Sequence, residues 1–242
     1  MKIYAATDIG MSRNMNQDYL FASETPVGNL PNLLIAADGM GGHVSGEFAS
    51  KFTVDEIVKS IRENAGTDAA FLLREAVLAA NRGLISYARE HQEMSGMGTT
   101  VVAAALAGTR LVVANVGDSR LYLAGSEMVQ VTEDHSLVQQ MVRLGELDPA
   151  EAKNHPDRNI ITRAVGADEN LTVDIYTVEA VPGDFILLCT DGLTNMVEDS
   201  VLFQILKENG KELPEKGKQL LDLANANGGK DNITVIVAEI GE

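Results

Sequence analysis

The stretch LLIAADGMGG at residues 33–42 decides the fold. Its first five residues are all apolar, and an uninterrupted apolar run is typical of a strand buried on one or both faces. An Asp-Gly pair follows directly, which indicates a turn at the end of that strand. The stretch FILLCTDG at residues 185–192 has the same design. Two strands of this kind predict sheets that pack against other layers of the protein.

Working outward, eight further apolar runs are predicted as strands: Ile3–Ile9, Asp18–Ala22, Thr99–Leu106, Leu111–Val116, Leu121–Ala124, Met128–Thr132, Leu171–Val178 and Ile233–Ile240. Glycine-containing turns at residues 108–109 and 125–126 favour antiparallel hairpins. Apolar residues at helical spacing predict helices at Ser45–Asn64, Asp68–Gln92, Asp199–Asn209 and Leu213–Asn225. Because strands and helices do not alternate strictly, a doubly wound parallel sheet is disfavoured. We predict an α+β fold in which two mostly antiparallel sheets pack face to face with helices outside.

Composition narrows the function classes. The chain has 242 residues and no low-complexity linker, which favours a single domain over residues 1–242. Lys and Arg total 19 against 35 Asp and Glu, a formal net charge of −16. Nucleic acid and anionic membrane surfaces are therefore disfavoured as partners, since both attract clustered cations. The acidic surplus itself fits either a solvated surface or carboxylates that bind metal.

Cysteine usage and hydropathy point to the compartment. The one cysteine, Cys189, excludes an internal disulfide and a cysteine-rich zinc site. The N-terminal residues show no signal-peptide core, and no apolar stretch is long enough for a membrane span. A cytoplasmic protein is predicted.

One connecting segment is unusually long. Residues 144–166 contain two glycines, two prolines and one histidine, and only one short predicted helix, at Pro149–Lys153. A connection of this length in a compact domain is often functional, so a flap at residues 144–165 is one interpretation. A solvated surface excursion is the other.

Aspartates recur where the predicted strands begin or end: Asp18, Asp38, Asp118, Asp191 and Asp231. Taken singly, each of them fits an ordinary turn. If the strand ends converge, however, the carboxylates form an anionic cluster that needs protons or cations to be stable. Oxygen-only ligands select hard cations such as Mg²⁺ or Mn²⁺.

Two such cations would support phosphate chemistry. A pair of metal ions clamps a phosphate group and lowers the pKa of a bridging water, so that phosphate esters are hydrolysed without a covalent enzyme intermediate. Arg13 lies five residues before Asp18, and a guanidinium pairs with phosphate oxygens in a fork. Without the neighbouring aspartate, Arg13 would be read as a solvated surface residue.

The motifs together resemble those of a known family. They are Gly10-x-x-Arg13-x-x-Asn16-Gln17-Asp18, Asp38-Gly39-Met40-Gly41-Gly42-His43, Gly98-Thr99-Thr100, Val116-Gly117-Asp118-Ser119-Arg120, Asp134-His135-Ser136, His155-Pro156, Thr162-Arg163-Ala164-Val165-Gly166, Thr190-Asp191-Gly192-Leu193 and Asp231-Asn232-Ile233-Thr234. In this order they resemble the metal-dependent serine/threonine protein phosphatases of type 2C, in their compact bacterial form. The resemblance spans nearly the whole chain, and it implies an α-β-β-α sandwich.

The resemblance also implies roles for particular residues. Asp38 would bridge two catalytic Mn²⁺ or Mg²⁺ ions, and the Gly39 carbonyl would bind one of them. Asp191 and Asp231 would hold the other ion, and Asp18 would act through metal-bound water.

Further roles concern the substrate and a third ion. Asp118 together with Asp191 would hold a weaker third ion, as in bacterial relatives. Arg13 would grip the substrate phosphate. Residues 144–165 would form the flap beside the site.

Two departures from the family pattern bear on these roles. Many eukaryotic relatives have a histidine directly after the Asp-Gly pair, as the proposed general acid, and here Met40 takes that place. The nearest histidine is His43, which would contact the substrate as an acid or else brace the glycine-rich loop; a metal-bound water is the remaining candidate for the acid. The first motif has Gln17 where glutamate is more common, but Asp18 is kept, so metal binding is expected to persist.

Rival functions are weaker. A haloacid-dehalogenase mechanism needs a nucleophilic aspartate two residues before Asp191, and Cys189 stands there. The glycine-rich loop at 39–42 lacks the Gly-Lys-Ser/Thr of a P-loop. A non-catalytic module would be expected to have lost ligands, whereas all five aspartates are present. A regulatory phosphatase acting on a phosphorylated anti-anti-sigma-type protein remains the alternative, although such members usually lack the flap.

The resemblance finally suggests the partners. The expected substrates carry phosphoserine or phosphothreonine, and they include a cognate bacterial kinase of the eukaryotic-like type together with its targets. A monomer is expected.

Overall fold

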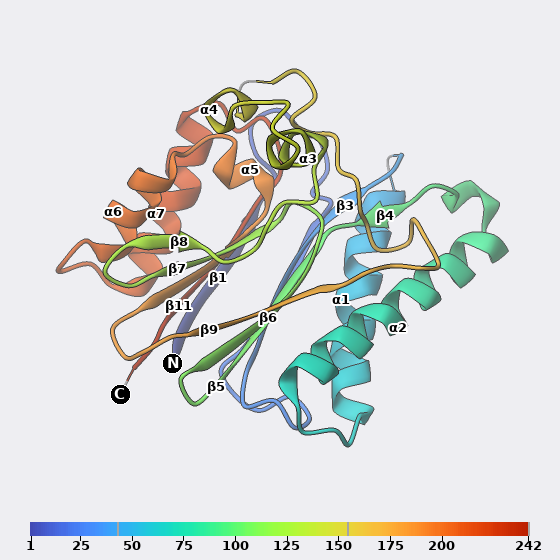
Figure 1. Cartoon of the computed structure of the whole chain (residues 1–242), viewed down its shortest axis with the longest axis horizontal. Coiled ribbons are helices and arrows are strands. Elements are labelled where there is room, and N and C mark those ends of the chain that lie inside the picture. Colours follow the sequence, from blue (N-terminus) through green and yellow to red (C-terminus); the bar gives the residue numbers. More distant parts are fainter. Residues whose placement is uncertain (43, 154, 242) are drawn as a thin grey trace.

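A computed structural model describes residues 1–42, 44–153 and 155–241. Two antiparallel sheets pack face to face, and each carries helices on its outer side (Figure 1). The first sheet has the strand order β1-β11-β10-β7-β8, with β1 Lys2–Asp8, β11 Ile233–Glu239, β10 Phe185–Cys189, β7 Arg120–Ala124 and β8 Met128–Gln130. The predicted α+β sandwich is therefore confirmed.

The second sheet has the order β2-β3-β5-β6-β9, with β2 Asp18–Ser23, β3 Leu33–Met40, β5 Val101–Ala107, β6 Arg110–Val116 and β9 Asp174–Glu179. The short strand β4, Gly98–Thr99, pairs with the end of β3. Both predicted hairpins are present, since β5 pairs with β6 across Gly108 and β7 pairs with β8 across Gly125.

The uninterrupted apolar strands are buried on both faces. In β3, Leu33, Ile35 and Ala37 pack toward α1 (Ser45–Glu63) and α2 (Ala69–Glu90), whereas Leu34 and Ala36 pack into the core between the sheets. The strand β10 repeats this pattern, with alternate residues facing the core between the sheets and the helices α6 (Asp199–Lys207) and α7 (Leu213–Ala226). Continuous hydrophobicity thus reflects two covered faces rather than one.

The helices form where capping and spacing favour them. Asp68 caps α2 by accepting a hydrogen bond from the Phe71 backbone N–H. The start of α7 has a capping box between Glu212 and Glu215. Within the described ranges, no helix combines the length and hydropathy that a bilayer crossing demands.

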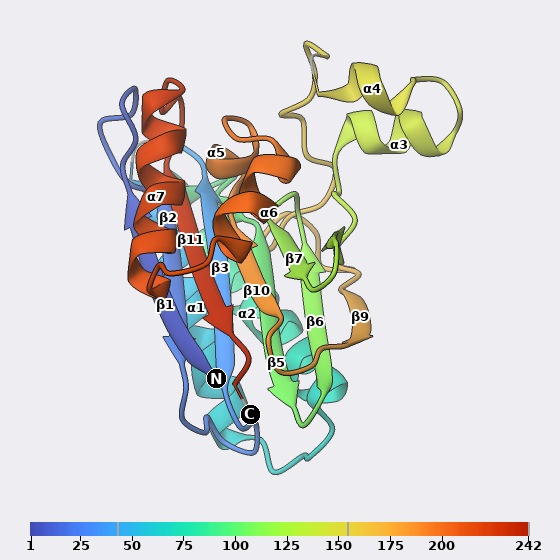
Figure 2. The same ribbon diagram turned by 90° about the vertical axis from the view of Figure 1, so that its left-hand side faces the viewer.

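Residues 137–153 and 155–160 form a projecting segment that differs from the prediction. This segment carries two helices, α3 (Leu137–Arg143) and α4 (Pro149–Ala152), which stand away from the sheets (Figure 2). The helix α3 was not predicted, so the projection begins earlier than residue 144. The strand expected at Leu171–Val178 begins only at Asp174, because Leu171 and Val173 are buried by packing with the helix-covered core and not by strand pairing.

Candidate active site

Strand ends from both sheets meet beside the projecting segment. Asp18 and Asp38 are register partners on the adjacent strands β2 and β3. In the other sheet, Asp191 follows β10 at the start of α5 (Asp191–Thr194), and Asp231 precedes the neighbouring strand β11. Asp118 lies in the turn from β6 to β7, where the chain passes from one sheet to the other. The structure therefore brings together all five predicted aspartates.

This proximity changes the acidity of the carboxyls. Loss of surrounding water, followed by the charges of Asp18, Asp191, Asp118 and Asp231, raises the pKa of Asp38 well above its ordinary value. Carboxylates packed this closely cannot all ionise unless cations neutralise them.

The neighbouring carboxyls respond in the same way. Burial raises the pKa of Asp18 to about 7, although hydrogen bonds from two threonines oppose the shift. Burial and the charge of Asp191 raise the pKa of Asp118 to about 8. Burial and the charge of Asp231 raise the pKa of Asp191 to about 6. Carboxyls whose pKa values are raised in this way form a site that is stabilised when a cation binds to it.

Two carboxylate oxygens in this cluster lack partners. Oδ2 of Asp18 accepts hydrogen bonds from Thr190 Oγ1 at 2.8 Å and Thr234 Oγ1 at 2.7 Å, but its Oδ1 is buried without a hydrogen bond. Oδ2 of Asp191 accepts from Asn195 Nδ2 at 2.9 Å, and its Oδ1 is likewise buried and unpartnered. Buried unpartnered acceptors are costly, and a cation would satisfy both.

The donor set fits cations that retain water. Across residues 1–42, 44–153 and 155–241, no three His, Cys, Asp or Glu side chains form a ready-made metal cage. Mg²⁺ is typically held by one or two carboxylates and keeps several waters, so a complete protein cage is not required. The all-oxygen donors fit Mg²⁺ or Mn²⁺ rather than a soft metal.

Gly39 and Arg13 complete the cluster. A Cβ at Gly39 would lie 2.0 Å from the Gly46 carbonyl oxygen, so only glycine fits this close approach of β3 to α1. Arg13, on the half-exposed loop between β1 and β2, donates from Nη2 to Asp231 Oδ2 at 2.7 Å. A guanidinium thus stands at the edge of the carboxylates, beside a groove that Gly41 and Gly42 line from the other side.

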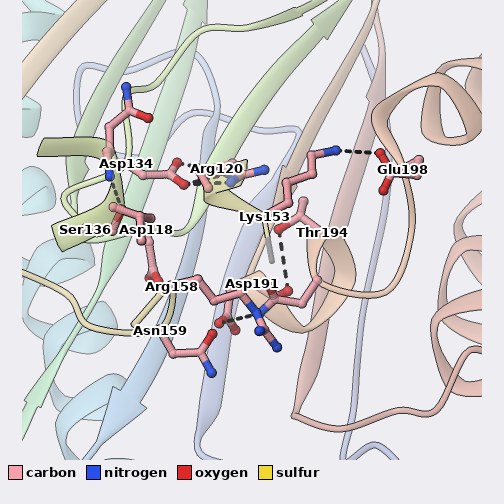
Figure 3. Close-up of a pocket in the computed structure, with 14 residues that line it drawn as sticks. Asp118, Arg120, Asp134, Ser136, Lys153, Arg158, Asn159, Asp191, Thr194 and Glu198 are labelled. Atoms are coloured by element: carbon pink, nitrogen blue, oxygen red, sulfur yellow. Dashed lines mark hydrogen bonds and ion pairs between the residues drawn. The ribbon is translucent and has the colours of Figure 1, made fainter. Parts of the chain in front are cut away.

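A cavity extends from the carboxylates to the projecting segment (Figure 3). Its lining includes Asp118 and Asp191 together with Lys153, Arg158 and Asn159 of the projecting segment. Lys153 Nζ pairs with Glu198 Oε2 at 2.5 Å, which links the projecting segment to the start of α6. The arrangement gives a polar chamber next to Asp118 and Asp191, with the cationic side chains of Lys153 and Arg158 in its lining.

Several residues of the site carried no predicted role. Thr190 and Thr234 orient Asp18. Arg120 forms a two-pronged ion pair with Asp134 on the cavity wall, with Nε at 2.9 Å from Oδ1 and Nη2 at 2.7 Å from Oδ2. Each stands inside a motif of the predicted family, which was the only sequence signal available. Met40 ends β3, where it pairs with Gly98, and His43 lies outside the described residues.

Comparisons with known proteins agree with the geometry. Residues 11–224 match the protein phosphatase 2C family. The serine/threonine phosphatase Stp of Listeria monocytogenes is 41% identical over 238 residues, covering 96% of this chain and 93% of the relative. The crystal structure of the Mycobacterium tuberculosis serine/threonine phosphatase PstP/Ppp superposes with a TM-score of 0.91 at 36% identity, covering 100% of this chain and 99% of that chain.

A further solved structure bears on the carboxylates. The catalytic domain of the serine/threonine protein phosphatase PstP, in complex with two manganese ions, has a TM-score of 0.88 at 34% identity, covering 100% of this chain and 98% of that chain. Because the aspartates converge and the sequence and structure are similar to those of these proteins, the chain belongs to the protein phosphatase 2C family and is a serine/threonine phosphatase.

Proposed function

We propose that this phosphatase depends on two Mn²⁺ or Mg²⁺ ions, with a weaker third, and that it hydrolyses phosphoserine and phosphothreonine in proteins. The observation that carries the proposal is the pair of buried, unpartnered oxygens on Asp18 and Asp191 within a cluster of carboxyls of raised pKa. The similar PstP domain crystallised with two manganese ions supports the choice of metal.

Each aspartate has a distinct proposed task. Asp38, with the Gly39 carbonyl, would hold the ions jointly, while Asp191 and Asp231 would hold one of them. Asp118 would share the weaker ion with Asp191, and Asp18, fixed by its threonines, would orient water. Bound metal ions supply charge neutralisation for phosphate and lower the pKa of water for direct attack on phosphorus.

The remaining residues handle the substrate. Arg13 would bind the phosphate oxygens through its forked donors, because its guanidinium already stands beside the carboxylates. The cavity under the projecting segment lies on the Asp118 side of the site and would receive the polypeptide next to the phosphorylated residue. His43 stays a prediction as a substrate contact.

We propose, further, that the chain acts as one catalytic domain over residues 1–242, as a monomer in the cytoplasm, and that it opposes a eukaryotic-like Ser/Thr kinase. One chain supplies every carboxylate of the cluster, which supports activity without a second copy. The molar mass of the purified protein, measured by light scattering, tests whether it is a monomer. The rates at which it dephosphorylates phosphopeptides from a kinase activation segment and a phosphorylated anti-anti-sigma protein test the substrate class.

The decisive experiment uses the purified full chain with a phosphothreonine peptide. Activity should vanish in EDTA and return with Mn²⁺, and Asp38→Asn should abolish it in both conditions. The surface variant Asp55→Asn, which alters only an exposed ion pair with Lys51, is the matched control and should behave as wild type. Hydrolysis that persists in EDTA, or that survives Asp38→Asn, would contradict the proposal.

A further inference from the structure

The loop that carries Arg13 has little apolar anchoring. Residues 9–17 connect β1 of one sheet to β2 of the other, and Met11, Ser12, Arg13 and Asn14 are all exposed. The Met11 side chain is 72% exposed, so it contributes no buried core to the loop. Without an apolar anchor, the shape of such a loop must come from hydrogen bonds.

One buried side chain supplies hydrogen bonds to both ends of this loop. Asn232, only 4% exposed, donates from Nδ2 to the carbonyl oxygens of Ile9 and Met15, both at 2.9 Å. Its Oδ1 accepts from the Gln17 backbone N–H at 2.8 Å. The side chain thereby ties the first residue of the loop to Met15 and Gln17 near its other end, and Arg13 lies on the segment between the tied points.

The neighbouring backbone reinforces the tie. The Gly229 carbonyl oxygen accepts hydrogen bonds from the backbone N–H groups of Met11 at 2.7 Å and Ser12 at 3.1 Å. The Asn232 backbone N–H donates to Asp231 Oδ1 at 2.8 Å, and Asp231 Oδ2 receives Arg13. The turn at residues 229–232 therefore fixes the path of the loop at 9–17 through hydrogen bonds to its backbone and to the Arg13 side chain.

Asparagine is chemically specific here. The position demands two N–H donors and one carbonyl acceptor on a single short planar group, and among the natural side chains only asparagine offers them at that length. An aspartate would keep the shape but would place carboxylate oxygens against two carbonyl oxygens. Alanine would remove the hydrogen bonds that Asn232 makes to three partly buried backbone groups.

We propose that Asn232 is a positioning residue that holds the loop at 9–17 so that Arg13 meets the substrate phosphate. This inference rests on the proposed function of Arg13. Asn232 touches neither substrate nor metal in this scheme and acts only through the loop.

The test compares Asn232→Ala and Asn232→Asp with wild type on a phosphothreonine peptide in Mn²⁺. We expect KM to rise roughly tenfold, and up to about 100-fold if the guanidinium moves by about 1 Å. The fall in kcat should be smaller, and the Mn²⁺ affinity measured by calorimetry should stay at the wild-type value. Asn227→Ala is the matched control, since this asparagine lies just before the turn, at the end of α7, and its side chain donates to the Met196 carbonyl oxygen instead of to the loop.

A double-mutant cycle separates positioning from general damage. In an Arg13→Ala background, Asn232→Ala should add no further rise in KM, because the residue it positions is already gone. Three results would each overturn the inference: effects of the two substitutions on KM that add up, a KM that stays at the wild-type value in the Asn232 variants, or a fall in Mn²⁺ affinity by the same factor as the rise in KM. An inactive wild-type protein would instead refute the proposed function.

A measurement on the unmodified protein covers variants that fail to fold. The Gln17 amide should exchange slowly with deuterium although its loop is largely exposed, because Asn232 holds it. Rapid exchange at Gln17 in wild type would overturn the inference without any variant.

Discussion

Raising the pH from about 5 to about 7 should destabilise the protein when EDTA keeps it free of metal. The pKa values of Asp18, Asp118 and Asp191 are about 7, 8 and 6 in the folded chain, whereas their ordinary value is 3.8. Because the folded pKa lies above the unfolded pKa, the folded protein holds more protons across this range. Their contribution to stability is complete below pH 3.8 and is lost as the pH rises toward about 8.

The size of the effect follows from the number of excess protons. Each one changes the free energy of unfolding by about 1.4 kcal/mol per pH unit, so these three carboxyls together with Asp38, whose pKa is also raised, set a ceiling of about 5.4 kcal/mol per pH unit. Since coupled carboxyls share protons, we expect one or two in excess, or about 1.4 to 2.8 kcal/mol per pH unit. Burial lowers the pKa of His135, which gives a contribution of opposite sign, but only from one group and only below pH 6.5.

Urea unfolding at pH 5, 6 and 7 measures this slope, with EDTA in one series and Mn²⁺ in the other. With EDTA, the free energy of unfolding should fall as the pH rises. With Mn²⁺, the slope should flatten or reverse, because metal binds the deprotonated carboxylates. A free energy that is constant or rises with pH in EDTA would refute the reasoning, since it would mean that the carboxyls are ionised and well separated.

Three further predictions concern single residues. When metal has been removed from the wild type with a chelator, Mn²⁺ at about 100 times its dissociation constant should stabilise it by roughly 2.7 kcal/mol, which is measured as a higher Tm. Asp38→Ala should remove most of that rise, and equal shifts in both proteins would contradict the metal assignment. Asp118→Ala should lose more activity on a phosphopeptide than on p-nitrophenyl phosphate, because the weaker ion that Asp118 would hold could supply the acidic water that protonates a departing serine, whereas nitrophenolate leaves without an acid; equal losses would argue against this leaving-group role. Leu34→Ala, in the core between the sheets, should lower the free energy of unfolding by about 2 to 5 kcal/mol in chemical denaturation, whereas Val129→Ala, 45% exposed, should change it little; a similar cost for both would mean that the inter-sheet core is not where the structure places it.

The sequence predicted the layers of the fold well, for a physical reason. Strands such as β3 and β10 bury both faces, so their hydrophobicity is local information that any reader of the sequence can use. The helix α3 was not predicted because it packs against little apolar core. Val138 is the only buried residue of α3. Burial of Leu171 and Val173 imitated a strand, although the packing that buries them comes from other elements.

The carboxylates of the site were also predictable, because each stands at a strand end next to a glycine or within a recurrent motif. Their supports were not. Thr190 and Thr234 bond to Asp18 across 172 and 216 residues of sequence, and Asn232 reaches Gln17 across 215. Nothing in the local sequence around a threonine or asparagine states which distant group it will meet, so such roles become visible only once the sheets are packed.

The wide separation of the site residues along the chain has a consequence for biosynthesis. Asp18 and Asp38 leave the ribosome well before Asp191 and Asp231, and β1 cannot pair with β11 before Ile233–Glu239 has emerged. A growing polypeptide therefore exposes half of an acidic cluster with no opposing half to share a cation. Newly made chains should therefore stay unable to remove phosphate until Asp231 and β11 have left the ribosomal tunnel and β11 has paired with β1.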